Sequence, residues 1–147
     1  MIKLICVGSI KEQYIKEAIN DYFNRINKLV KLKIVEVNEE ISNIEKETIN
    51  ILSKIKEKDY KILLDLNGSQ YNTTNFSKKI NDLFLYGKSN VTFIIGGSNG
   101  VSEKLKNIVD EKISFSKLTF PHQLFRVIFL EQLYRIFKIL NNEPYHK

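Results

Sequence analysis

The sequence predicts an α/β domain in which a mostly parallel sheet is flanked by helices. Short apolar runs alternate with longer segments in which apolar residues recur every three or four positions, and these patterns are typical of buried strands and of amphipathic helices. The alternation is strict, and no internal repeat, linker or low-complexity tract interrupts it. Such alternation favours a parallel sheet. With 147 residues, we expect a single domain over residues 1–147, large enough to bury a core.

Five apolar runs are expected to form the strands. The first, Ile2 to Val7, is interrupted only by Lys3 and ends at Gly8. The third, YKILLDL, is closed by the turn signal NGS. The five expected strands span residues 2–7, 32–37, 60–66, 91–95 and 113–118.

Five helices are expected between and after these strands. A side-chain oxygen at a helix start can accept a hydrogen bond from a free backbone N–H group. Thr73 or Thr74 can supply it for the third helix, and Ser102 for the fourth. The expected helices span residues 14–29, 41–55, 73–84, 102–109 and 121–141.

The last of these helices is apolar around nearly its whole circumference. A surface helix needs one apolar stripe, whereas residues 124–140 carry apolar side chains in almost every direction. In a small domain, a second subunit is the best cover for the second side. We therefore expect a homodimer in which this helix forms a twofold interface.

Charge and cysteine content bound the class of protein. The net charge is +6, and residues 117–147 carry five bases against two acids, a net charge of +3. This balance permits a polyanionic partner. The single cysteine, Cys6, cannot form an internal disulfide and lies in an apolar run, which fits a reducing cytoplasm. No run is long enough for a membrane span and no signal peptide is evident, so we expect a cytoplasmic protein.

Three loops are candidates for a ligand site. In an open α/β sheet, ligands bind beyond the carboxyl ends of the strands, and residues 64–68, 96–100 and 115–120 follow three such ends. Glycines allow a ligand to approach the backbone closely, and three loops on one rim can enclose a small molecule. Ordinary tight turns with helix caps would give the same pattern.

Several familiar sites do not match. The loop GGSNG is not followed by GKS or GKT, so it is not a phosphate-binding P-loop. The first strand ends in VGSIKE, which lacks the three glycines of the dinucleotide fingerprint. No cysteine or histidine cluster indicates a metal, and no arrangement of serine, histidine and acid indicates a hydrolase.

Longer segments of the sequence resemble one known family. FIIGGSNG, SFSKLTFPHQLFRV, EQLYRIFKI and the terminal PYHK, in this order, are similar to the RlmH family, the ribosomal large subunit methyltransferases H of the SPOUT superfamily. The opening IKLICVGSIKEQYIKEAINDYFNRI fits the same family. The resemblance therefore spans the whole chain and is most specific in its last third.

The resemblance implies a fold and a methyl donor. Members of the family have a deep trefoil knot at the carboxyl end of a parallel sheet, form homodimers, and bind S-adenosylmethionine in the knot loops, largely through backbone groups. By motif match, the donor contacts in this sequence are Leu64, Gly96, Phe115, Ser116, Lys117, Leu118, Thr119 and Phe120.

The resemblance also implies a reaction. The family methylates N3 of a pseudouridine in 23S rRNA, usually within the assembled ribosome, by direct displacement and without a metal. The reaction needs an in-line approach and removal of the imino proton.

Four residues are expected to serve this reaction. His122 follows Pro121 at a helix start, where it either lies on the rim of the donor site or organises the loop. Tyr145 and His146 are expected to close over the site, with the partner subunit's site favoured and His146 preferred for proton acceptance or base contact. Arg126 is expected to contact phosphate or base.

One segment departs from the family, and two other functions remain open. Residues 38–43, NEEISN, are short and acidic, whereas many members have a longer, more basic stretch there, so we expect no RNA contact from this segment. The alternatives are a dimeric ribosome-binding protein without turnover, and a flavodoxin-like module that uses GGSNG for phosphate.

Overall fold

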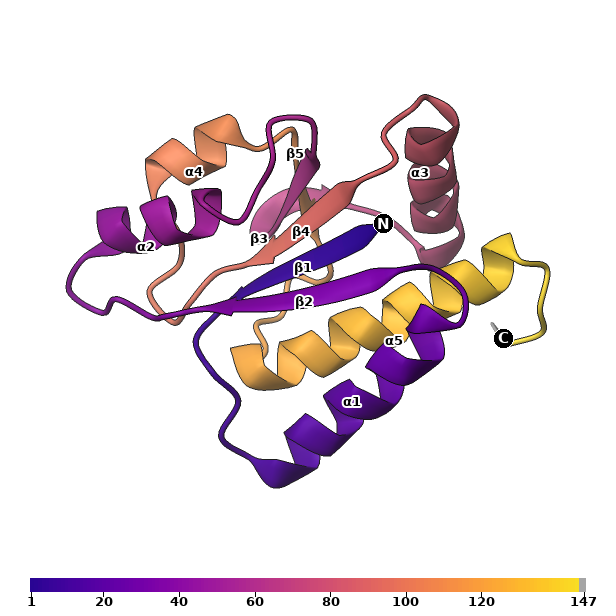
Figure 1. Cartoon of the computed structure of the whole chain (residues 1–147), viewed down its shortest axis with the longest axis horizontal. Coiled ribbons are helices and arrows are strands. Elements are labelled where there is room, and N and C mark those ends of the chain that lie inside the picture. The colour runs from indigo at the N-terminus through magenta and orange to yellow at the C-terminus, as the bar shows by residue number, and fades with distance from the viewer. Residues whose placement is uncertain (146–147) are drawn as a thin grey trace.

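The five apolar runs form one parallel sheet. The computed structural model describes residues 1–145. Its strands lie in the order β2-β1-β4-β3-β5, and each neighbouring pair is parallel (Figure 1). This arrangement confirms the predicted fold class. The strands are β1 (Ile2–Val7), β2 (Leu32–Val37), β3 (Tyr60–Gln70), β4 (Val91–Ile95) and β5 (Glu111–Ser114).

Helices cover both faces of the sheet. The connections through α1 and α3 run toward the β2 edge, and those through α2 and α4 run toward the β5 edge. Right-handed crossovers in opposite directions place their helices on opposite faces. Accordingly α1, α3 and α5 lie on one face, and α2 and α4 on the other (Figure 1). The helices are α1 (Gln13–Asn27), α2 (Ile44–Leu52), α3 (Thr73–Leu85), α4 (Glu103–Ile108) and α5 (His122–Leu140).

Two hydrophobic clusters, one on each side of the sheet, make up the core. β1 and β4 are buried along their whole length, and successive side chains of a strand point to opposite faces. Leu4 therefore packs in the cluster that contains Phe129 of α5, and Ile5 in the cluster that contains Ile51 of α2. Within residues 1–145, no helix has the length and hydropathy to span a membrane.

β3 continues past the predicted turn. It runs to Gln70, and its register against β5 shifts between Leu64 and Ser69. Gly68 lies in this irregular stretch, where an added Cβ would lie 2.6 Å from the backbone nitrogen of Ile113. The turn signal NGS thus marks a bulge at which two strands approach closely, rather than the end of a strand.

The helix boundaries agree with the sequence in part. Ser102 caps α4 as predicted, with its hydroxyl accepting a hydrogen bond from the amide three residues later at 3.2 Å. The predicted cap of α3 by Thr73 or Thr74 is wrong, because the Asn72 side chain accepts that bond at 2.8 Å. α2 is also shorter than the predicted 41–55, because Asn43 caps it and so begins the helix later.

Arg126 joins α5 to the carboxyl ends of β1 and β2. Its guanidinium donates to the Glu36 carboxylate at 2.6 Å and to the carbonyls of Val7 and Gly8 at 3.1 and 2.7 Å. The residue is only 3% exposed. This burial argues against the phosphate or base contact expected from the sequence, since the guanidinium is already engaged within the chain.

We expect Arg126→Ala to lower the free energy of unfolding by about 2–3 kcal/mol, because it leaves the buried Val7 carbonyl without a partner. Glu36 is half-exposed and can be hydrated, which limits the loss. Urea unfolding measures the effect. Arg25→Ala is the control, since the Arg25–Asp21 pair is exposed and should contribute at most about 1 kcal/mol. An Arg126→Ala protein with unchanged stability and weakened rRNA binding would restore the original expectation.

Cys6 should be unreactive in the native protein. The side chain is fully buried, and this burial raises the pKa of the thiol to about 12. Alkylation needs an accessible thiolate, so iodoacetamide at pH 8 should add no mass until urea unfolds the chain, after which a single adduct forms. Rapid labelling of the folded protein would contradict this packing.

Candidate active site

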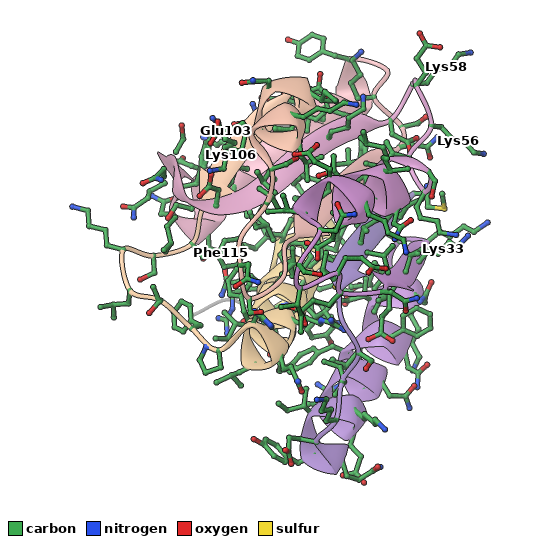
Figure 2. All side chains as sticks on the ribbon, turned by 90° about the vertical axis from the view of Figure 1, so that its left-hand side faces the viewer. Lys33, Lys56, Lys58, Glu103, Lys106 and Phe115 are labelled. Atoms are coloured by element: carbon green, nitrogen blue, oxygen red, sulfur yellow. The ribbon has the colours of Figure 1, made fainter. Side chains whose placement is uncertain are left out.

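A cavity of about 410 Å³ lies where β4 and β5 end, beside residues 63–66 within β3. The segments that follow β4 and β5 supply most of its walls. β5 ends at Ser114 rather than at the predicted Leu118, which leaves residues 115–120 free to line the cavity. In Figure 2, which views the molecule from this side, Phe115 lies below Lys106 and Glu103 of α4.

The cavity gathers most of the site residues that the sequence predicts. Every expected donor contact except Lys117 lines it, and His122, the first residue of α5, lines it as well. Lys117 is exposed and is not part of the lining. The predicted residues that do line the cavity are Leu64, Gly96, Phe115, Ser116, Leu118, Thr119, Phe120 and His122.

Phe115 fixes the last of the three segments to the core. Its ring lies 5.3 Å from that of Phe125 and 5.8 Å from that of Phe129, centroid to centroid. The following turn is closed by Ser116, whose hydroxyl accepts a hydrogen bond from the Leu118 amide at 2.9 Å. Packing on one side and a turn on the other therefore shape this wall.

The glycine loop, residues 96–100, needs its glycines for space and for backbone conformation. A Cβ at Gly96 would lie 2.6 Å from Cγ1 of Val101. Gly100 has a φ of +75°, a conformation that residues other than glycine rarely adopt. The loop is closed by the Gly100 amide, which donates to the carbonyl of Gly97 at 3.1 Å. The backbone groups of this loop thus stand close to the cavity.

The sequence analysis did not identify two charged residues at the site, Lys106 and Glu39. Lys106 lines the cavity from α4, although the pattern of that helix indicates only core and surface positions. Glu39 accepts hydrogen bonds from the amide and hydroxyl of Ser98, at 3.2 and 2.5 Å, and these bonds lower the pKa of its carboxyl. No local pattern predicts this contact, because the two residues are 59 positions apart.

The lining determines what the cavity can hold. It combines apolar side chains with loop backbone and only two side chains of full charge, Asp65 and Lys106. Such a lining and volume are typical of a site for a small organic molecule. Residues 1–145 contain no group of three or more histidine, cysteine, aspartate or glutamate side chains placed to hold a metal ion.

Tyr145 lies at the opposite end of α5 from the cavity. Its hydroxyl donates to Glu131 at 3.3 Å, and the Arg135 guanidinium, which is paired with Glu131, lies 5.0 Å from its ring centroid. Glu131 lies nine residues, roughly 13 Å, along α5 from His122, so the Tyr145 hydroxyl is remote from His122 of its own chain. His146 lies outside the described residues.

Curated proteins of high similarity carry one common name. Proteins named ribosomal RNA large subunit methyltransferase H are 49% identical in Fusobacterium nucleatum, 47% in Clostridium tetani and 46% in Clostridium perfringens. Each alignment covers 99% of this chain and 99% of the relative.

Solved structures share the fold at low sequence identity. A "probable methylase family protein" from Haemophilus influenzae matches with a TM-score of 0.56 and 10% identity, over 99% of this chain and 70% of that one. The SpoU methyltransferase AviRb from Streptomyces viridochromogenes matches with a TM-score of 0.50 and 10% identity, over 97% and 61%.

The family comparison agrees with both results. The family model described as "Predicted SPOUT methyltransferase" matches residues 1–146, which include all three segments around the cavity. The chain therefore belongs to the SPOUT methyltransferases, among the ribosomal RNA large subunit methyltransferases H.

Proposed function

We propose that the protein uses S-adenosylmethionine to methylate N3 of a pseudouridine in 23S rRNA of the assembled ribosome, and thus works in the cytoplasm. The observation that carries the proposal is the cavity beside β3 and the ends of β4 and β5, which is lined by seven of the eight donor-contact residues that the motif match selects. The names of the full-length relatives support a large-subunit rRNA substrate. The trefoil knot implied by the resemblance stays a prediction.

The cavity fits the proposed donor. An added Cβ would lie 2.6 Å from Cγ1 of Val101 at Gly96 and 3.0 Å from Cγ1 of Val7 at Gly97, so both positions leave little room for a side chain, and both residues line the cavity. Leu118 is 71% exposed beside the cavity and can cover an apolar face of the ligand. When bound, S-adenosylmethionine supplies the methyl group for direct displacement from its sulfonium.

The acceptor needs a group that takes the proton from N3. His122 lines the cavity at the start of α5. Its imidazole can accept a proton or organise the loop. His146 of the tail remains our preferred proton acceptor, with Tyr145 beside it over the site.

We propose a homodimer because Tyr145 packs against Glu131 and Arg135 of its own α5, away from its own cavity. The inner face of α5 is buried against the sheet, while apolar residues on its outer side, among them Leu124, Val127 and Ile128, are only partly covered. A twofold axis across this outer side would run two α5 helices in opposite directions. Tyr145 and His146 of one subunit would then approach the cavity of the partner.

Methyl transfer tests the activity. Labelled methyl from S-adenosylmethionine should appear on a 23S rRNA pseudouridine when the protein is incubated with ribosomes from a strain that lacks it, and mass spectrometry of nucleosides identifies the product. Because positively charged side chains of the protein would contact rRNA phosphates, the affinity for rRNA should fall as the salt concentration rises. Absence of label on ribosomes and on free subunits, while the donor still binds, would exclude this substrate.

Heterodimers of two inactive variants test whether the tail acts on the partner. One variant is Gly96→Val, which fills the cavity wall, and the other is Tyr145→Ala with His146→Ala. A heterodimer purified through two tags should recover about half the wild-type rate, since one of its two composite sites is intact.

The reciprocal heterodimer is the control. Wild-type chain paired with a chain that carries all three substitutions should be inactive if the tail acts on the partner, and about half active if it acts on its own subunit. A protein that is monomeric by light scattering at micromolar concentration would contradict the dimer itself.

A further inference from the structure

The segment between β2 and α2 contacts the glycine loop at several points. We propose that Glu39 is a positioning residue that holds the glycine loop in the shape that binds the methyl donor. The proposal rests on the proposed function for the identity of the ligand. It assigns a task to the acidic segment 38–43, for which the sequence predicts no RNA contact.

Glu39 acts on the donor cavity through Ser98. One carboxylate oxygen, Oε1, accepts both the Ser98 amide at 3.2 Å and the Ser98 hydroxyl at 2.5 Å. Ser98 lines the donor cavity, whereas Glu39 lines a neighbouring cavity of about 310 Å³. The two cavities share His122. Glu39 therefore stands behind the wall of the donor site and does not touch the donor itself.

The glycine loop needs an external support. It contains three glycines in five residues, and Ser98 and Asn99 are exposed. Such a backbone has many conformations when free, and ordering it costs free energy. A contact that orders the loop before binding removes this cost from the binding step. The bond from the Ser98 amide is the most direct such contact, because it fixes the backbone itself.

The support is itself anchored. The Glu40 amide donates to Oε2 of Glu47 at 3.1 Å, and Glu47 is buried. Beyond the loop, the hydroxyls of Thr48 and Ser102 share a buried hydrogen bond of 2.6 Å. Contacts from the segment between β2 and α2 reach the glycine loop at Ser98, and a contact from α2 reaches the helix cap that follows the loop, so the loop is held on both sides.

The position next to Ser98 shows how closely the two segments fit. A Cβ at Gly97 would lie 3.1 Å from Oε1 of Glu39 and 3.0 Å from Cγ1 of Val7. The carboxylate therefore packs against bare backbone at this point. Glutamine at position 39 would preserve the shape and one acceptor oxygen, whereas alanine would remove both.

Donor binding by the full-length protein tests the role of Glu39. With S-adenosylhomocysteine as the calorimetric probe, Glu39→Ala should raise Kd about three- to tenfold, because it removes a charged acceptor from two partly exposed hydrogen bonds. In the methyl-transfer assay the donor KM should rise by a similar factor while kcat at saturating donor changes little. Glu39→Gln should recover most of the affinity.

Two further variants locate the effect. Glu40→Ala is the matched control, since it removes the same charge one residue away and leaves the backbone bond to Glu47 in place; it should bind as wild type. Adding Ser98→Ala to Glu39→Ala should cost no more than Glu39→Ala alone, because the Ser98 hydroxyl has already lost the carboxylate that accepts its hydrogen bond. Unchanged Kd and KM in Glu39→Ala, or an equal loss in Glu40→Ala, would overturn the proposal.

Amide hydrogen exchange without ligand separates this proposal from the proposed function. The glycine-loop amides should exchange faster in Glu39→Ala than in wild type or Glu40→Ala, and those of β1 should not change. If wild-type protein binds no S-adenosylhomocysteine, the donor assignment fails, and equal loop exchange in all variants would then reject Glu39 as well. Faster exchange confined to the loop would support its positioning role.

Discussion

The burial of β1 and β4 on both faces is the constraint on which the structure depends. Two central strands without an exposed side chain face require cover above and below, so connections must cross one face or the other before returning to the sheet. Parallel strands then end at one common edge. The segments after β4 and β5 that line the cavity are found at this edge, because each connection leaves the sheet there before it crosses a face.

The parts of the fold that depend on local pattern could be predicted from the sequence. The spacing of apolar residues and the presence of capping side chains were enough to place the strands, most of the helices and the cap at Ser102. The start of α2 and the cap of α3 were missed because Asn43 and Asn72 cap these helices, and two strand boundaries failed because a long-range contact decided them. The NGS stretch became a bulge because Gly68 meets the backbone of Ile113 across the sheet, and β5 stopped early because Phe115 turns into the aromatic cluster of α5.

The candidate site shows the same division. The loops around the cavity could be predicted because their position follows from strand order, and the resemblance selected the residues on them. The charged residues that support the site, Arg126 and Glu39, could not be predicted in that role. Arg126 bonds to Glu36 across 90 positions of sequence, and Ser98 bonds to Glu39 across 59 positions. Nothing in the sequence around these residues distinguishes a paired charge from a free one. A basic residue near a proposed RNA site is therefore weak evidence for phosphate contact.

The contacts of Arg126 also bear on how the chain is made. The carbonyls that its guanidinium holds belong to residues 118 and 119 positions earlier, and α5 supplies five fully or nearly fully buried apolar side chains to one cluster, namely Phe129, Leu130, Leu133, Ile136 and Phe137. During synthesis, the face of β1 that packs against α5 stays uncovered until α5 has been made. Native packing can be completed only once the carboxyl-terminal helix has left the exit tunnel, so the nascent chain passes through a stage with an open apolar face.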